Sequence, residues 1–123
     1  MKKSSSKRDY RDFLIDIAFS AEQAEKFIEG FTFESFSQDE KTKYAVIRAL
    51  EIIGEAVKNV PQKFKNERKE IPWKDMADLR NELIHEYFGV NAKVVWKALK
   101  NDIPNIRDKM SKLLKELKIN KLI

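Results

Sequence analysis

The stretch that decides the fold is residues 44–60, which read YAVIRALEIIGEAVKNV. Its apolar residues recur at steps of three and four, the period of an amphipathic α-helix that buries one face. The predicted buried stripe comprises Tyr44, Ile47, Leu50, Ile53, Val57 and Val60. Gly54 would allow a neighbouring helix to approach closely, because it has no Cβ. We expect this helix to run from about Gln38 to Val60, with Ser37 and Glu40 forming a capping box at its start.

The residues before this stretch predict another amphipathic helix, from Lys7 to Glu29, which Gly30 stops. Its expected buried positions are Tyr10, Phe13, Leu14, Ile17, Ala18, Ala21, Ala24 and Ile28. Residues 31–36 follow as a predicted loop. Its three aromatic side chains, Phe31, Phe33 and Phe36, are expected to cap the core of the bundle.

The residues after Pro61 predict two more long helices. The charged segment 62–70 should hold one short helical turn, and Pro72 is well placed as the first residue of a third helix that ends near Phe88 and Gly89. That helix is expected to bury Trp73, Met76, Leu79 and Leu83. Asn91 should cap a fourth helix, in which Pro104 introduces a kink or a break.

No strand pattern appears, so the predicted fold class is all-α. We expect an antiparallel bundle of four main helices, or five if one is short or broken. The predicted domain covers residues 7–118, preceded by a flexible arm at 1–6 and followed by a tail at 119–123.

The composition excludes several classes of protein. The chain has no cysteine, which excludes disulfides, zinc fingers and cysteine nucleophiles. No apolar run approaches the roughly 20 residues that span a bilayer, and the basic start leads into no apolar signal core. We therefore expect a cytoplasmic protein without a membrane segment. The net charge of +5 favours a polyanionic partner only weakly, because 25 basic residues face 20 acidic ones.

Residues 80–87, which read RNELIHEY, carry the only histidine of the chain. Asn81 and His85 lie four residues apart on one helical face, and the long side chain of Arg80 is close enough to bend toward them. An imidazole that moves protons and a guanidinium that binds phosphate oxygens suit RNA cleavage without a metal. Such a reaction needs both a base and an acid. One histidine per chain supplies both either in succession or through a twofold dimer that brings two copies of His85 to one cleft.

A purely structural interpretation of these residues stays open. A histidine near the end of a helix often serves as a capping or packing residue, and Arg80 could pair with Asp78 or Glu82 on the surface. Trp73 and Trp96 are expected in the core rather than in base stacking.

Metal chemistry is poorly supported by the sequence. A transition-metal site needs more nitrogen or sulfur ligands than one histidine provides. Glu51 and Glu55 form an i,i+4 carboxylate pair that could hold a hard cation, but Arg48 and Lys58 nearby favour a salt-bridged helix face. We expect neither a metal nor another cofactor.

Almost the whole chain, from Lys7 to about Leu117, resembles the HepT family of HEPN toxins. The resemblance includes the segments 45–48, 52–56 and 71–73, which read AVIR, IIGEA and IPW. Its most specific part is the pattern of Arg80, four residues, His85, one residue and Tyr87, with Asn81 after the arginine.

This resemblance implies a dimeric HEPN bundle and a metal-independent endoribonuclease toxin in which Arg80, Asn81 and His85 are catalytic. It also implies a partner, the MntA-type minimal nucleotidyltransferase, which transfers AMP from ATP to the tyrosine of the motif, here Tyr87. A different class of function also fits: a non-catalytic nucleotide-binding subunit of a nucleotidyltransferase. A bundle that merely dimerises is a third.

Overall fold

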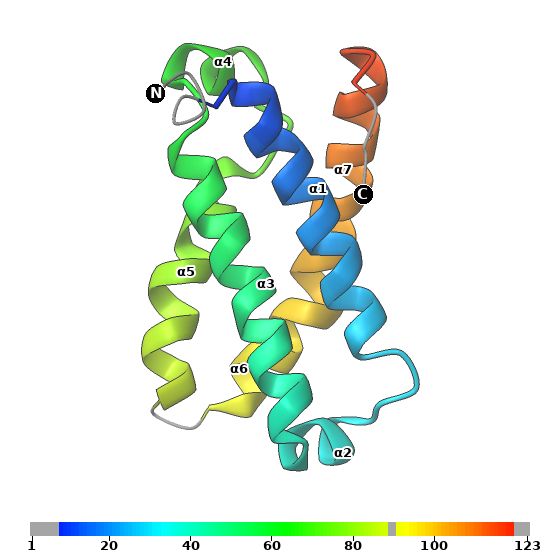
Figure 1. The fold of residues 1–123 in the computed structure, drawn as a ribbon. Helices are drawn as coiled ribbons and strands as arrows, with labels where there is room; N and C mark the ends of the chain where they lie inside the picture. The colour runs from blue at the N-terminus through cyan, green and yellow to red at the C-terminus, as the bar shows by residue number, and fades with distance from the viewer. Residues whose placement is uncertain (1–7, 89–90, 120–123) are drawn as a thin grey trace, which may run out of the picture.

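The computed structural model describes residues 8–88 and 91–119, with side chains described for 8–80 and 91–119. Its elements are α1 (Tyr10–Phe27), α2 (Phe33–Gln38), α3 (Glu40–Lys58), α4 (Gln62–Glu67), α5 (Trp73–Phe88), α6 (Ala92–Lys97), the π-helical η2 (Ala98–Asp102) and α7 (Ile103–Glu116). The described residues contain no strand. Four long rods, namely α1, α3, α5 and the joined α6, η2 and α7, run alternately up and down (Figure 1). The predicted all-α antiparallel bundle is confirmed.

Helix α3 is the central rod, because it packs against both α1 and α5, while α1 also packs against α7. Its predicted stripe is buried at Ile47, Leu50, Ile53, Val57 and Val60. The expectation for Tyr44 was wrong: its side chain is 58% exposed. Tyr44 lies in the first turns of α3, where the helical period alone does not tell which apolar positions have a neighbour to cover them.

The segment after Gly30 is a helix and not the predicted loop. Thr32 and Ser35 form a capping box that starts α2, with the Ser35 amide donating to Thr32 Oγ1 at 3.1 Å and the Thr32 amide donating to Ser35 Oγ at 2.9 Å. Phe36 is fully buried and its ring lies 5.2 Å from that of Trp96, so the predicted capping of the core by aromatics is confirmed.

The start of α3 also differs from the prediction. Asp39 caps it by accepting the Thr42 amide at 3.0 Å, whereas the Ser37 hydroxyl donates to the Glu34 carbonyl inside α2. The predicted capping box of Ser37 and Glu40 is therefore wrong. Asp39 and Ser37 are both good N-cap residues, and the presence of α2 decides between them.

The last rod is continuous through Pro104. Asn91 caps α6 as predicted, its side chain accepting the Val94 amide at 3.2 Å. Pro104 has no amide hydrogen to continue the α-helical pattern. The chain responds with the wider turn of η2, in which the Ile103 amide donates to the Ala98 carbonyl five residues back. The predicted kink or break is therefore a π-helical turn.

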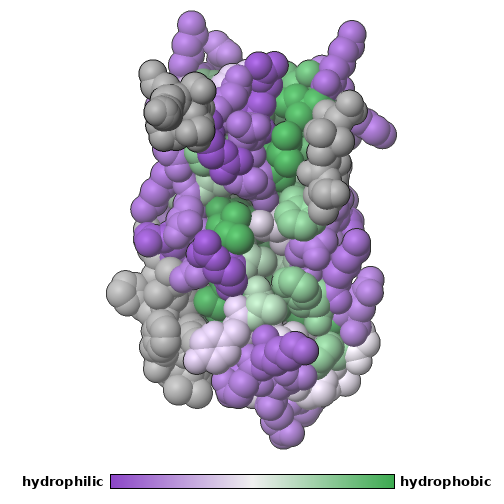
Figure 2. Space-filling view, in the orientation of Figure 1, coloured by the Kyte–Doolittle hydropathy of each residue, from purple (hydrophilic) through white to green (hydrophobic). Residues whose placement is uncertain are grey.

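On the face seen in Figure 2, hydrophilic side chains predominate among the described residues, and apolar side chains reach the surface in patches. None of the helices in the described part of the chain is long and apolar enough to cross a membrane. The predicted arm at 1–6 lies outside the described residues, as do residues 120–123 of the predicted tail.

Candidate functional site

The candidate site is built on α5, whose first turn is held by two hydrogen bonds. The Met76 amide donates to the Pro72 carbonyl at 3.1 Å, and the Trp73 indole nitrogen donates to the Arg68 carbonyl at 2.9 Å. From there the helix continues without interruption to Phe88 and carries positions 80, 81, 85 and 87 in sequence. A single regular helix therefore sets the spacing of all the predicted site residues.

Arg80 lies where α5 crosses α3 at Gly54. A Cβ built on Gly54 would collide with the Cβ of Arg80 and would lie 3.1 Å from its amide nitrogen and 3.3 Å from its Cα. The close approach predicted for Gly54 is thus confirmed, and Arg80 is the residue that uses it. The absent side chain at position 54 determines how near the base of Arg80 comes to α3.

The guanidinium group of Arg80 contacts Glu55, the residue that follows Gly54 in α3. Its Nε lies 3.4 Å from the Glu55 carboxylate Oε2, close enough for an ion pair. Nε is also buried and makes no hydrogen bond of good geometry, so the contact with Glu55 is electrostatic without being a well-aligned hydrogen bond. The Arg80 side chain as a whole is 36% exposed. Its exposed surface belongs to atoms other than Nε.

The sequence analysis suggested different ion pairs for Arg80, Glu51 and Glu55. Asp78, one suggested partner of Arg80, pairs instead with Lys74 at 2.9 Å, and Glu51 pairs with Arg48 at 3.4 Å. The predicted salt-bridged face of α3 is confirmed for Arg48 and Glu51 only, because Glu55 pairs across to Arg80 of α5. Among the residues with described side chains, no group of three histidine, cysteine or acidic residues could hold a metal ion.

The side chains of Asn81, His85 and Tyr87 lie outside the described residues, as does that of Leu83. Helical register still places positions 81 and 85 on one face of α5 and separates positions 85 and 87 by about 200°. The helix continues past position 87 to Phe88.

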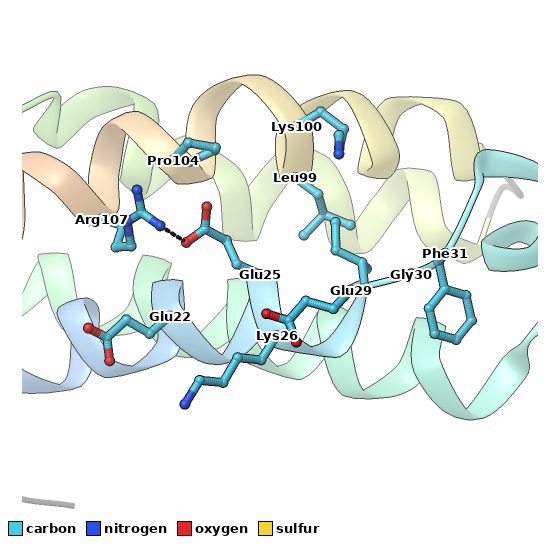
Figure 3. Close-up of a pocket in the computed structure, with 11 residues that line it drawn as sticks. Glu22, Glu25, Lys26, Glu29, Gly30, Phe31, Leu99, Lys100, Pro104 and Arg107 are labelled. Atoms are coloured by element: carbon cyan, nitrogen blue, oxygen red, sulfur yellow. Dashed lines mark hydrogen bonds and ion pairs between the residues drawn. The ribbon is translucent and has the colours of Figure 1, made fainter.

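A hollow of about 520 Å³ lies between the end of α1 and the start of α7, away from the crossing of α3 and α5. Figure 3 shows its mixed lining, with Glu22, Glu25 and Glu29 beside Lys26, Lys100 and Arg107. Arg107 donates to Glu25 at 2.8 Å and to Asp108 at 2.8 Å. The hydrogen bond to Asp108 and the charge of Glu25 raise the pKa of Arg107. This arginine is held in a structural ion pair, and the hollow is separate from Arg80.

A second hollow, lined from α5 by Asp75 and Asp78, lies beside α6 and η2, which contribute Lys97 and Asp102. Partial burial raises the pKa of Asp102, and the nearby charge of Asp75 raises it further. The folded state therefore disfavours ionised Asp102. The free-energy cost of holding ionised Asp102 in the folded protein is present above the pKa of Asp102 in that protein and is lost as the pH falls through it. Below the ordinary pKa of an aspartate, Asp102 is protonated in both the folded and the unfolded states, so no cost remains.

We expect Asp102→Asn to stabilise the protein slightly at pH 7, with a rise in Tm of about 2 °C or less, because most of the Asp102 side chain is solvated. Thermal unfolding followed by circular dichroism at pH 7 and again at about pH 3 checks this. The Tm values of the wild-type protein and the variant should converge at the acidic pH. A lower Tm for the variant at pH 7 would contradict it.

Comparison with known proteins adds an independent line of argument. The model of the family described as "Ribonuclease HepT-like" matches residues 17–113. The "Probable ribonuclease HepT" of Thermococcus cleftensis is 53% identical over 109 residues, covering 89% of this chain and 99% of that protein. A candidate RNase of Methanocaldococcus jannaschii is 44% identical over 111 residues, covering 90% and 92% of the two chains. Another, from Caldanaerobacter subterraneus, is 39% identical over 108 residues, covering 88% and 96%.

No solved structure matches the chain. The family model nevertheless spans α5 and all of α3 with its Gly54 and Glu55, and the relatives align over nearly their full lengths. The chain therefore belongs to the ribonuclease HepT-like family.

Proposed function

We propose that this protein is a metal-independent endoribonuclease toxin that cleaves RNA at Arg80, Asn81 and His85 and is neutralised by AMPylation of Tyr87. Membership of the ribonuclease HepT-like family supports the endoribonuclease activity. The observation that carries the site is the partly exposed side chain of Arg80, whose Nε faces Glu55 of α3. Arg80 lies on α5, the helix that also carries position 85. A cytoplasmic location, where RNA is available, is part of the proposal.

The chemistry assigned to these residues is a transesterification. An imidazole takes the proton of a ribose 2′-hydroxyl, whose oxygen attacks the adjacent phosphorus, and the bond from phosphorus to the 5′-oxygen breaks. A second, protonated imidazole gives its proton to that leaving oxygen. Arg80 binds the phosphate oxygens as negative charge builds up on them, and the Asn81 amide adds a neutral donor. The products are a 2′,3′-cyclic phosphate and a 5′-hydroxyl, and no metal or oxidant is consumed.

The acid and the base come from two subunits in this proposal. Each chain has one histidine, so a symmetric homodimer that brings two copies of α5 together would supply both imidazoles at once. The two Arg80 side chains would then add positive charge to the same cleft.

The proposed switch acts on Tyr87. A nucleotidyltransferase of the MntA type would join the tyrosine oxygen to the α-phosphorus of ATP and release pyrophosphate. The adenylyl group would then fill the cleft and repel RNA phosphates. Because α5 is regular through position 87, the modified residue sits on a different side of that helix from position 85. The group would therefore reach the cleft across the dimer.

The test is incubation of the purified protein with end-labelled RNA in the presence of a chelator. Cleavage to fragments that end in a cyclic phosphate supports the proposal. Binding of ATP with intact RNA would instead support the non-catalytic nucleotide-binding subunit. Protein shown by mass spectrometry to carry AMP on Tyr87 should be inactive, and full cleavage by that form would overturn the proposed switch.

A further inference from the structure

Two adjacent residues of α3 contact Arg80 at opposite ends of its side chain. Gly54 receives the Cβ of Arg80 in the close crossing of α3 and α5. Glu55 faces Nε, three bonds further along the side chain, with its Oε2 at 3.4 Å. Arg80 is therefore held at its base by packing and near its tip by charge.

We propose that Glu55 is a positioning residue for Arg80, and that it orients the guanidinium for RNA phosphate. This inference rests on the function proposed above. It adds to that function a carboxylate outside the motif, on another helix and 25 positions earlier in the chain.

The shape of the arginine fork explains why a contact at Nε matters. A guanidinium is a rigid plane with five N–H donors, and it binds a phosphate best with two parallel donors. Glu55 attracts the Nε edge, and rotation about the last side-chain bonds is thereby restricted. The amino groups at the opposite end of the plane are left to face a phosphate.

The present geometry fits a resting state of the enzyme. Nε is buried but makes no well-formed hydrogen bond, and the Glu55 side chain is 47% exposed. Catalytic contacts are often long in the absence of substrate and shorten when it binds. When an RNA phosphate binds the two amino groups of the guanidinium, Nε stays free to bind Glu55. We expect the distance between Arg80 Nε and Glu55 Oε2 to shorten in that state.

Stability does not account for this pair. Both side chains are more than a third exposed, and ion pairs of that kind contribute little to the free energy of folding because water screens them. Position 55 is on the exposed side of a long regular helix, where alanine is favoured intrinsically. Glu55→Ala should therefore fold normally, which makes it a clean test of function.

We expect Glu55→Ala to lower kcat for labelled RNA by about 10- to 100-fold, the scale of loss from a misplaced catalytic group. KM should stay the same or fall, since a negative charge near the RNA phosphates has been removed. Glu55→Gln keeps the length and one acceptor oxygen and should recover part of the rate. In an Arg80→Ala background, Glu55→Ala should have no further effect, because its target is gone.

The matched control is Glu25→Ala. Glu25 also makes a partly exposed ion pair with an arginine of another helix, Arg107 of α7, at 2.8 Å. This variant removes an equivalent pair away from α5 and should leave kcat unchanged. Equal losses in both variants, or a loss for Glu55→Ala that persists without Arg80, would overturn the positioning role.

A second measurement separates this inference from the proposed function. In ¹⁵N NMR spectra, hydrogen exchange at Arg80 Nε should be slow in the wild-type protein and faster in Glu55→Ala. The signal of Arg107 should be unaffected by that change. If the wild-type protein leaves RNA intact, the nuclease proposal fails, while this exchange rate still decides whether Glu55 holds Arg80. Unchanged exchange in Glu55→Ala would overturn the inference whatever the activity.

Discussion

Replacing His85 by alanine is expected to lower the rate of RNA cleavage by about 10²- to 10⁴-fold, the contribution of a positioned general acid or base. Each chain has no other histidine, so a homodimer of the variant would lose both imidazoles. The measurement is the initial rate of cleavage of labelled RNA in the presence of a chelator. Cleavage at the wild-type rate by His85→Ala would remove the imidazole from the mechanism.

The same variant tests whether two subunits share one site. When wild-type protein is mixed with an excess of His85→Ala and allowed to exchange subunits, most wild-type chains should enter dimers that hold one imidazole. Their activity should fall below that of wild-type protein diluted alone. Activity that stays proportional to the amount of wild-type chain would mean that each subunit works alone. Circular dichroism of the variant checks that its fold is intact.

The second large effect is expected from Gly54→Ala, which should destabilise the protein by about 1–3 kcal/mol. The new methyl group would collide with the Cβ of Arg80 and press on its backbone, so α5 must shift as a unit. Alanine is a better helix former than glycine by about 1 kcal/mol, which opposes this cost without cancelling it. The expected fall in Tm is about 5–10 °C by thermal unfolding.

Lys58→Ala is the matched control, since Lys58 is an exposed residue one turn further along α3. It should change the free energy of unfolding by no more than about 0.5 kcal/mol. The folded fraction of Gly54→Ala should also cleave RNA more slowly, because the shift moves Arg80 away from its working position. A Gly54→Ala protein as stable as the wild type would show that α3 and α5 do not need their close approach.

The long helices could be predicted because the local sequence of each contains the apolar period of an amphipathic helix and the residues that end it. In α3 the apolar period, the glycine and the final proline all agree, and the structure follows them. Helix α2 was missed because six residues are too few to display a period, although Thr32 and Ser35 carry a recognisable capping signal. The wide turn of η2 was seen only as a disturbance at Pro104. The sequence shows that the α-helical pattern fails there and not how the backbone adapts.

The candidate site divides in the same way. Arg80, Asn81, His85 and Tyr87 lie within one turn or two of each other, so their spacing is visible in the sequence. Glu55 was noticed only as one half of a carboxylate pair with Glu51. Its contact with Arg80 depends on how α3 and α5 cross, and that crossing is set by packing around Gly54, which local patterns do not encode.

The π-helical turn at Ala98–Asp102 also gives the last rod two differently phased halves. Before it, α6 packs against α5 and α2; after it, α7 packs against α1. The surplus residue rotates the buried stripe partway along the rod, so that a single uninterrupted helix serves neighbours on two sides. As a result, α5, which carries Arg80, and α1 both pack against the same continuous rod, α5 against its first part and α1 against its last.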